Sequence, residues 1–368
     1  MPLPISKEEL PDKVQRFGAP DAPTAAKRMA ARGLVPVKGD DLVTLLVQLG
    51  SDTDAEVAEA ASNTLQGMPE GVVLAACGAS LHHAILEGLA HHVKDRPALL
   101  SELAANRDLP DEALVRVARF CDERTAERIA LDQQRVLAFP EIIEALYKNR
   151  NTRMSTADRL VELAARNGVE LSGVATFAAH VEAIQGQLIP DEPLDEPLPS
   201  DTIFNETLEV DSEEVAVDVD KVDGSEEVRE KARPLATRIA DMSTSEKIRL
   251  TLVGNAAARS LLVRDPQKLV YMAAIKSPSM TDAEAARIAA SKQISEDVLR
   301  QIGQRRDWLG NYEVKRNLVI NPKTPVGISM KFLSHLRAND LRSVARSKNI
   351  PTALRTAAKQ RVEKKSRR

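Results

Sequence analysis

The stretch VINPKTPVGI, residues 319–328, contains the pattern that decides the fold: an apolar helix end, a polar turn and the start of another helix. In four further stretches an apolar residue precedes Pro, Ser or Thr at the new helix, where it can staple the turn to that helix. These stretches are AANRDLPDEAL (104–114), AIKSPSMTDAEA (274–285), AASKQISEDVL (289–299) and ARSKNIPTAL (345–354). Because a short helix cannot bury its apolar face alone, such repeated units must stack on their neighbours.

Apolar residues elsewhere recur at spacings of three and four, the period of a helix with one buried face. Four leucines between Leu42 and Leu49 form one such stripe. The segments 53–56, 243–246 and 281–284 place Thr or Ser three residues before Glu, the spacing of a capping box that starts a helix. We therefore predict an all-α fold with two short α-solenoid domains of stacked helices.

Charge is unevenly distributed along the chain, although the formal net charge is only -3. Residues 1–190 contain 20 basic and 27 acidic residues. Residues 191–227 contain one basic and 15 acidic residues, whereas residues 228–368 contain 30 basic and 12 acidic ones. An acidic segment thus precedes a strongly basic one, and such an asymmetry concerns the partners of a protein more than its fold.

The acidic segment combines like charges with Pro193, Pro197 and Pro199, which interrupt helices. We expect it to be disordered and extended. Two interpretations are open. It is either a solubilising spacer or an interaction segment that folds onto a groove through apolar residues placed among the acids. Those apolar residues are Ile203, Phe204, Leu208 and Val210.

The expected domain organisation has five parts. They are a flexible N-terminus (1–19), an N-terminal helical-repeat domain (20–188), an acidic disordered linker (189–229), a basic C-terminal helical-repeat domain (230–362) and a basic tail (363–368).

Residues 321–351, NPKTPVGISMKFLSHLRANDLRSVARSKNIP, resemble the leucine-rich repeat variant found in bacterial α-helical solenoids. The N-terminal domain resembles HEAT-type repeats, above all over residues 42–65. These resemblances imply an all-helical interaction scaffold and name no partner. The positions that match the variant pattern are Asn321, Pro322, Thr324, Pro325, Leu341, Arg342, Val344, Ala345 and Pro351.

The sequence predicts no catalytic, cofactor-binding or metal-binding residue. Some members of the variant family carry a cysteine-bound iron–sulfur cluster, but this chain contains only Cys77 and Cys121, which are 44 residues apart. Cys77 has apolar neighbours and is expected to be buried, and the acidic neighbours of Cys121 disfavour a thiolate. The histidine pairs at 82–83 and 91–92 lack the spacing of a metal site. We therefore expect a protein that is not an enzyme.

Basic residues gather in the last third of the chain together with two aromatic residues. We expect them to form a stripe that binds an anionic partner, with Trp308 available to stack on a base. The residues of this candidate site are Arg305, Arg306, Trp308, Tyr312, Lys315, Arg316, Lys323, Lys331, Arg337, Arg342, Arg346, Lys348 and Arg355.

The favoured function is a scaffold or adaptor that binds partner proteins along its repeat surfaces, and the alternative is nucleic-acid binding by the basic domain. The tethered acidic linker would cover the basic face and compete with an anionic partner. The first residues, MPLPISKEELPDK, lack the apolar core of a signal peptide, and no apolar run approaches the roughly 20 residues of a membrane span. We expect a cytoplasmic protein.

Overall fold

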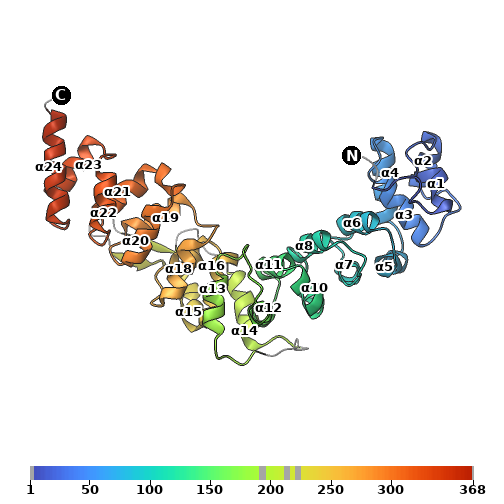
Figure 1. Ribbon diagram of the computed structural model, residues 1–368, viewed down its shortest axis with the longest axis horizontal. Coiled ribbons are helices and arrows are strands. Elements are labelled where there is room, and N and C mark those ends of the chain that lie inside the picture. The colour runs from blue at the N-terminus through green and yellow to red at the C-terminus, as the bar shows by residue number, and fades with distance from the viewer. Residues whose placement is uncertain (1–3, 190–195, 211–215, 220–224, 367–368) are drawn as a thin grey trace. The chain divides into compact units, whose positions relative to one another are not determined.

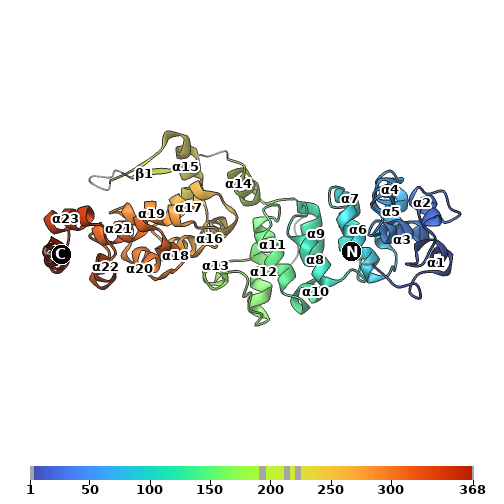
Figure 2. The same cartoon turned by 90° about the horizontal axis from the view of Figure 1, so that it is seen from above.

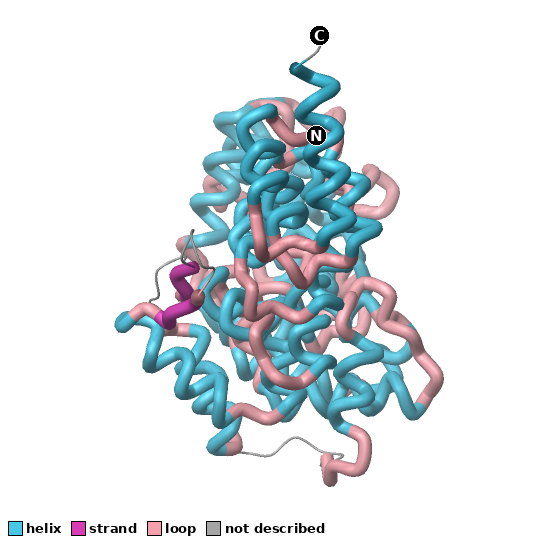
Figure 3. The backbone as a smooth tube through the Cα atoms, turned by 90° about the vertical axis from the view of Figure 1, so that its left-hand side faces the viewer, coloured by secondary structure: helices cyan, strands magenta, loops and turns pink. Residues whose placement is uncertain are grey.

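The computed structural model describes residues 4–189, 196–210, 216–219 and 225–366. These residues form 24 α-helices, two short 3-10 helices and one antiparallel pair of three-residue strands. Helices account for most of the described backbone, and the strands are the short magenta segments in Figure 3. The prediction of an all-helical fold built from many short, mutually packed helices is confirmed.

Helix contacts divide the chain into two compact units, of which the first contains α1 to α12. Its helices are seven to thirteen residues long apart from the six-residue α10. Their bounds are α1 (Asp12–Gly18), α2 (Thr24–Ala31), α3 (Asp40–Leu49), α4 (Ala55–Gln66), α5 (Glu70–Gly78), α6 (His83–His92), α7 (Pro97–Ala104), α8 (Asp111–Ala118), α9 (Glu123–Leu131), α10 (Gln133–Ala138), α11 (Glu141–Lys148) and α12 (Met154–Arg166).

Within the first unit most helices pack against the helix two places later in the chain. One row contains α1, α3, α5, α7 and α9, and the second contains α2, α4, α6 and α8 and continues with α11. Figure 1 shows α6, α8 and α11 following one another, with α5 and α7 of the other row beside them. Each helix therefore buries one side against its own row and another side against the other row, as repeated helices do.

The second unit contains the remaining elements. Their bounds are α13 (Phe177–Ile184), α14 (Pro199–Leu208), β1 (Val217–Val219), β2 (Glu226–Val228), η1 (Glu230–Ala232), α15 (Arg233–Asp241), α16 (Thr244–Val253), α17 (Ala256–Leu262), α18 (Lys268–Lys276), α19 (Asp282–Ala290), α20 (Glu296–Gln304), η2 (Trp308–Gly310), α21 (Tyr312–Ile320), α22 (Val326–Leu333), α23 (Ala338–Arg346) and α24 (Thr352–Ser366).

Two rows are also found in the second unit. Figure 2 shows α17, α19, α21 and α23 following one another beside the row of α16, α18, α20 and α22. Gly303 allows α20 and α22 to approach closely, because a Cβ at this position would lie only 2.7 Å from the Cγ2 atom of Ile328. The pattern of neighbouring helices in this unit thus repeats that of the first.

The predicted apolar stripes form the core. Leu45, Leu46 and Leu49 are fully buried, whereas Leu42 is half-buried. In the second unit Val298, Leu299 and Ile302 are also fully buried. The cores are made mainly of leucine, isoleucine, valine and alanine, whose modest size suits the close spacing of short helices.

Two of the three predicted capping boxes are present. Ser243 with Glu246 caps α16, and Thr281 with Glu284 caps α19. At α4 the prediction is wrong by one residue: Asp54, rather than Thr53, precedes the helix. Its carboxylate accepts the backbone N–H of Glu56 at 3.0 Å, which a carboxylate at this position does at least as well as a hydroxyl.

A buried asparagine joins successive helices of a row at three turns. Asn149, which follows α11, donates through Nδ2 to the carbonyls of Ala118 (3.0 Å) and Cys121 (2.9 Å) at the end of α8. Its Oδ1 accepts the N–H of Asn151 at 2.9 Å. The same three bonds are made by Asn106 with Cys77, Ala79 and Asp108, and by Asn321 with Ala289, Ser291 and Lys323. These asparagines donate to carbonyls at helix ends, which lack an intrahelical donor. The carbonyl of Cys121 also accepts from Nδ2 of Asn151 at 3.0 Å.

The N-terminal residues are folded where the sequence analysis expected flexibility. Ile5, Leu10 and Val14 are buried, and residues 12–18 form α1. The fully buried Gln48 accepts the N–H of Ile5 at 3.1 Å and donates to its carbonyl at 2.8 Å. Apolar side chains and a buried amide therefore fix residues 4–18 on α3, and composition alone does not reveal this.

The described parts of the expected disordered linker are folded as well, so that expectation is corrected for residues 196–210, 216–219 and 225–229. Residues 199–208 form α14. Asp201 in its first turn accepts the backbone N–H of Leu198 at 2.9 Å and so stabilises the start of the helix. The strands β1 and β2 pair in antiparallel register. Residues 190–195, 211–215 and 220–224 lie outside the described residues.

The limits of the units also differ from the expected domain limits. Residues 172–189 belong to the second unit, because α13 packs on α16. Residues 363–366, expected to be part of a tail, continue α24.

Candidate binding surfaces

We consider the basic residues of the second unit in two groups. In the first, between α15 and α20, several are paired with carboxylates, whereas Arg233, Lys276 and Arg287 have no ion pair in the described residues. Lys247 lies 3.1 Å from Asp265, and both side chains are more than nine-tenths buried. Arg259 is similarly buried 3.1 Å from Glu284. Further pairs are Arg238–Glu206, Arg264–Glu226, Lys268–Asp297 and Arg300–Glu296. Carboxylates of this region, together with Glu206 of α14 and Glu226 of β2, therefore neutralise part of the positive charge between α15 and α20.

The second group consists of the predicted cations of residues 305–355, and these are largely without such partners. Arg316 pairs with Asp340 at 2.9 Å. None of the other ten has a carboxylate within ion-pair distance in the described part of the chain. We call these ten side chains the distal basic surface: Arg305, Arg306, Lys315, Lys323, Lys331, Arg337, Arg342, Arg346, Lys348 and Arg355.

Trp308, which the sequence predicts to be available for stacking on a base, is instead buried, whereas Tyr312 is half-buried. Trp308 is only 4% exposed, and the guanidinium carbon of Arg305 lies 4.4 Å from its ring centre. The hydroxyl of Tyr312 donates to Asp340, and the guanidinium carbon of Arg337 lies 4.4 Å from the centre of its ring. Both rings support the arginines instead, through cation–π contacts.

Of the four apolar residues expected in the linker, two are buried and two are at least partly exposed. Phe204 is fully buried and Leu208 is 8% exposed, whereas Ile203 is 46% exposed and Val210 is half-buried. The ring of Phe204 lies 5.2 Å from the guanidinium carbon of the buried Arg249 in α16. Phe204 and Leu208 therefore pack α14 within the second unit, while Ile203 is exposed, and the role of this segment in binding a partner stays a prediction.

The acidic residues around α14 meet cations near the start of the second unit. Glu206 lies 3.6 Å from Arg238, and Glu226 accepts from the Nε of Arg264 at 2.8 Å. Asp218 receives two hydrogen bonds from Arg229, at 2.8 and 3.0 Å. In the described residues, the acidic segment therefore pairs with cations other than those of the distal basic surface.

Neither cysteine has the environment of a nucleophile. Cys77 and Cys121 are buried. Burial raises the pKa of the Cys77 thiol to about 12. Burial and the neighbouring charge of Asp122 raise the pKa of Cys121 to about 12. Among the described residues, no three His, Cys, Asp or Glu side chains are grouped so as to hold a metal ion.

Both thiols should therefore resist alkylation in the folded chain. At about pH 8 a thiol with a pKa near 12 is on the order of 0.01% thiolate, and the thiolate is the reactive form. Iodoacetamide should label neither cysteine until the chain is unfolded in urea, as measured by intact mass. Rapid labelling of Cys121 in the folded protein would contradict its burial.

A groove between α8 and α11 is a surface that the sequence analysis missed. It has a volume of about 660 Å³, within the range of ligand-binding pockets. Val115, Phe139 and Ala145 provide its apolar lining. Charged side chains provide the rest: Glu112, Arg116, Arg119, Glu141, Glu144 and Lys148.

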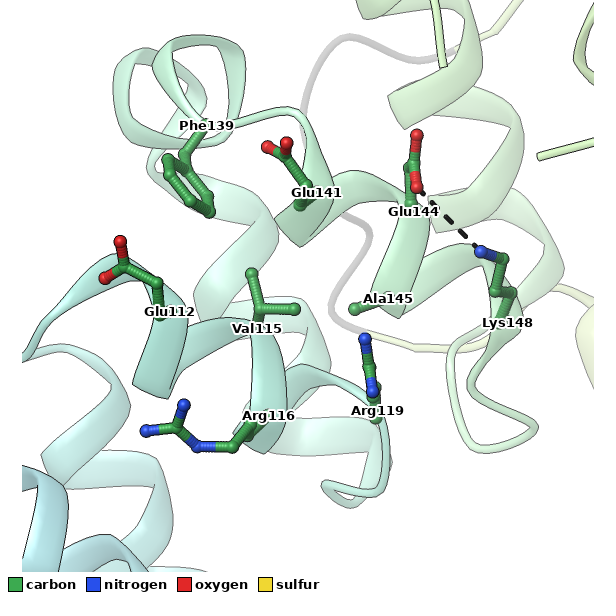
Figure 4. Close-up of a pocket in the computed structure, with 9 residues that line it drawn as sticks. All are labelled: Glu112, Val115, Arg116, Arg119, Phe139, Glu141, Glu144, Ala145 and Lys148. Carbon is green, nitrogen blue, oxygen red and sulfur yellow. Dashed lines mark ion pairs between the residues drawn. The ribbon is translucent and has the colours of Figure 1, made fainter. Parts of the chain in front are cut away.

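Both ends of the groove contain acidic and basic side chains, but those without an ion pair in the described chain are separated along its length. Figure 4 shows Glu112, Glu141 and Arg116 toward one end, with Arg119, Lys148 and Glu144 toward the other. Glu112 and Glu141 lie in the first turns of α8 and α11, and Arg119 and Lys148 lie at the ends of the same helices. A spacing of three or four between charged residues on each helix was the available sequence signal, but it does not tell which two helices are neighbours.

The chain matches no protein-family model, no curated protein and no solved structure. No helix in the described residues is both long and apolar enough to cross a membrane.

Proposed function

We propose that this chain is a non-enzymatic scaffold of HEAT-like and leucine-rich-repeat-variant-like helices, arranged as two short solenoids. It binds an acidic segment of a partner protein through the distal basic surface. The observation that carries this proposal is the set of ten cations in residues 305–355 that have no carboxylate partner in the described chain.

Cations without an internal ion pair can bind an acidic partner without first breaking a contact within the chain. A paired cation such as Arg259 would have to give up Glu284 before it could bind another anion. Arg342 and Arg346, which are exposed and four residues apart on α23, have no such ion pair to break. An approaching acidic segment therefore breaks no internal ion pair at these two residues, and their positive charge steers it to the site.

The aromatic contacts favour a protein partner over a nucleic acid. Binding of single-stranded nucleic acid commonly uses exposed rings on which bases stack. Trp308 is buried, and Tyr312 is held between Asp340 and Arg337. At Trp308 and Tyr312 a nucleic acid would therefore make phosphate contacts without base stacking. Nucleic-acid binding is kept as one outcome of the test below.

The test compares two ligands and two variants of the full-length chain. Fluorescence anisotropy would measure binding of an acidic peptide and of a single-stranded RNA, each of about 15 units, over a salt series. The distal variant is Arg342→Glu with Arg346→Glu. The matched control is Arg32→Glu with Lys38→Glu, which reverses two exposed charges in the first unit.

We expect the peptide to bind the distal variant at least about tenfold more weakly than the unchanged chain, since two contacts become repulsive. The control variant should bind within about twofold of the unchanged chain, because neither of its altered residues belongs to the distal basic surface. Equal losses in both variants would overturn the site. Binding of RNA without binding of the peptide would replace the proposal with nucleic-acid recognition.

A further inference from the structure

The groove between α8 and α11 has charges that are not satisfied within the described chain. Glu112, Glu141 and Arg119 have no ion pair there, whereas Arg116 pairs with Glu87 and Lys148 lies 3.8 Å from Glu144. Two unpaired carboxylates therefore lie at the end where the helices begin, and an unpaired guanidinium lies at the end where they finish (Figure 4). The lining between these ends is apolar.

The walls of the groove are fixed in register by buried hydrogen bonds. Asn149, next to Lys148, donates to the carbonyls of Ala118 and Cys121 on either side of Arg119. The ends of α8 and α11 are thereby tied together beneath the basic end of the groove. A groove whose walls are already fixed loses little conformational entropy when a ligand binds.

We propose that this groove binds an amphipathic helix of a partner protein, oriented antiparallel to α8 and α11. The N-terminal turn of that helix carries a carboxylate that meets Arg119 and Lys148. Its C-terminal turn carries a lysine or arginine that meets Glu112 and Glu141. Apolar side chains between them contact Val115, Phe139 and Ala145. In this orientation the dipole of the bound helix also opposes the dipoles of α8 and α11.

The spacing of the charges defines the sequence pattern of the partner. Glu112 and Arg119 are seven residues apart, as are Glu141 and Lys148. At 1.5 Å per residue, seven residues of helix span about 10.5 Å. A partner helix brings residues i and i+7 to one face, with i+3 and i+4 between them. The expected pattern is an acidic residue at i, apolar residues at i+3 and i+4, and a basic residue at i+7.

This inference rests on the proposed role as a protein-binding scaffold, but it uses the first unit alone. Loss of acidic-peptide binding at the distal basic surface would leave the groove unaffected. The two proposals can therefore fail separately.

The test uses two helical peptides of about 15 residues, long enough to form helix when bound. The first carries Glu at i, Leu at i+3 and i+4, and Lys at i+7. The second is identical except that Glu and Lys are exchanged. Both have blocked ends and the same net charge, so a difference in affinity reports charge order alone. Binding to the full-length chain is measured by fluorescence anisotropy.

The first peptide should bind about fivefold to tenfold more tightly than the second, as expected for a few partly exposed charge contacts. The variant that carries Arg119→Glu, Glu112→Lys and Glu141→Lys together should reverse this preference. The control variant carries Arg124→Glu, Glu59→Lys and Glu70→Lys, which makes the same charge changes at exposed positions outside the groove. It should keep the original preference.

Equal affinity of the two peptides for the unchanged chain would overturn the proposal. So would an unaltered preference in the groove variant, or the absence of binding of both peptides at about 1 mM, the weak limit of specific recognition. Circular dichroism of each variant establishes that the helices are retained, so that a loss of binding is not a loss of folding.

Discussion

Replacing Asn149 with alanine should lower the free energy of unfolding of the first unit by about 2–4 kcal/mol. The substitution removes the Nδ2 bonds to the carbonyls of Ala118 and Cys121 and the acceptor of the Asn151 N–H, and it leaves the Cys121 carbonyl with the Nδ2 of Asn151 alone. Asn149 is 3% exposed, so water does not readily replace these bonds. Urea denaturation followed by circular dichroism would measure the loss.

Asn167→Ala is the matched control for this prediction. Asn167 also donates through Nδ2 to a carbonyl, that of Leu163, but the bond is exposed to solvent. Its loss should cost less than about 0.5 kcal/mol, because water takes over the carbonyl. A similar cost for both substitutions would show that the buried asparagines do not hold the helix rows together.

Replacing Phe204 with alanine should release α14 from the second unit. The fully buried ring contacts Arg249, and removal of a buried phenylalanine costs about 3–5 kcal/mol. A single short helix has little stability of its own to set against that loss. Amide hydrogen exchange over residues 199–208 should therefore become fast, while exchange in α18 to α20 changes little.

The neighbouring residue provides the control. Ile203 lies on the same helix but is 46% exposed, so Ile203→Ala should leave the exchange of α14 nearly unchanged. If α14 exchanges quickly in the unaltered protein as well, the acidic segment is disordered in solution, and the docked helix is wrong.

The helices and their stacking were accessible from the sequence because both depend on local patterns. The leucines at positions 45, 46 and 49 follow the period of one helix, and the turn containing Asn321 recurs at other helix ends. The failure at residues 199–208 has a physical cause. The net negative charge of a long segment predicts disorder, but it averages over Phe204 and Leu208, which lie four residues apart on one helical face.

The charge pairing and the groove required knowledge of which helices are neighbours. Arg264 is 38 residues from Glu226, and their contact depends on where β2 lies relative to α17. The groove depends on α11, rather than α9 or α10, following α8 in its row. Sequence spacing shows that Glu112 and Arg119 share a helix, but it does not show which helix forms the opposite wall.

Cross-linking mass spectrometry of the full-length chain in the cells that produce it would test the central claim most directly. We predict that lysine cross-links to other proteins concentrate at Lys315, Lys323, Lys331 and Lys348 of the distal basic surface, and that the linked partner peptides are acidic. Cross-links spread equally over exposed lysines of the first unit such as Lys38 and Lys94 would contradict the account. Nucleotides joined to residues 305–355 after ultraviolet irradiation would contradict it as well.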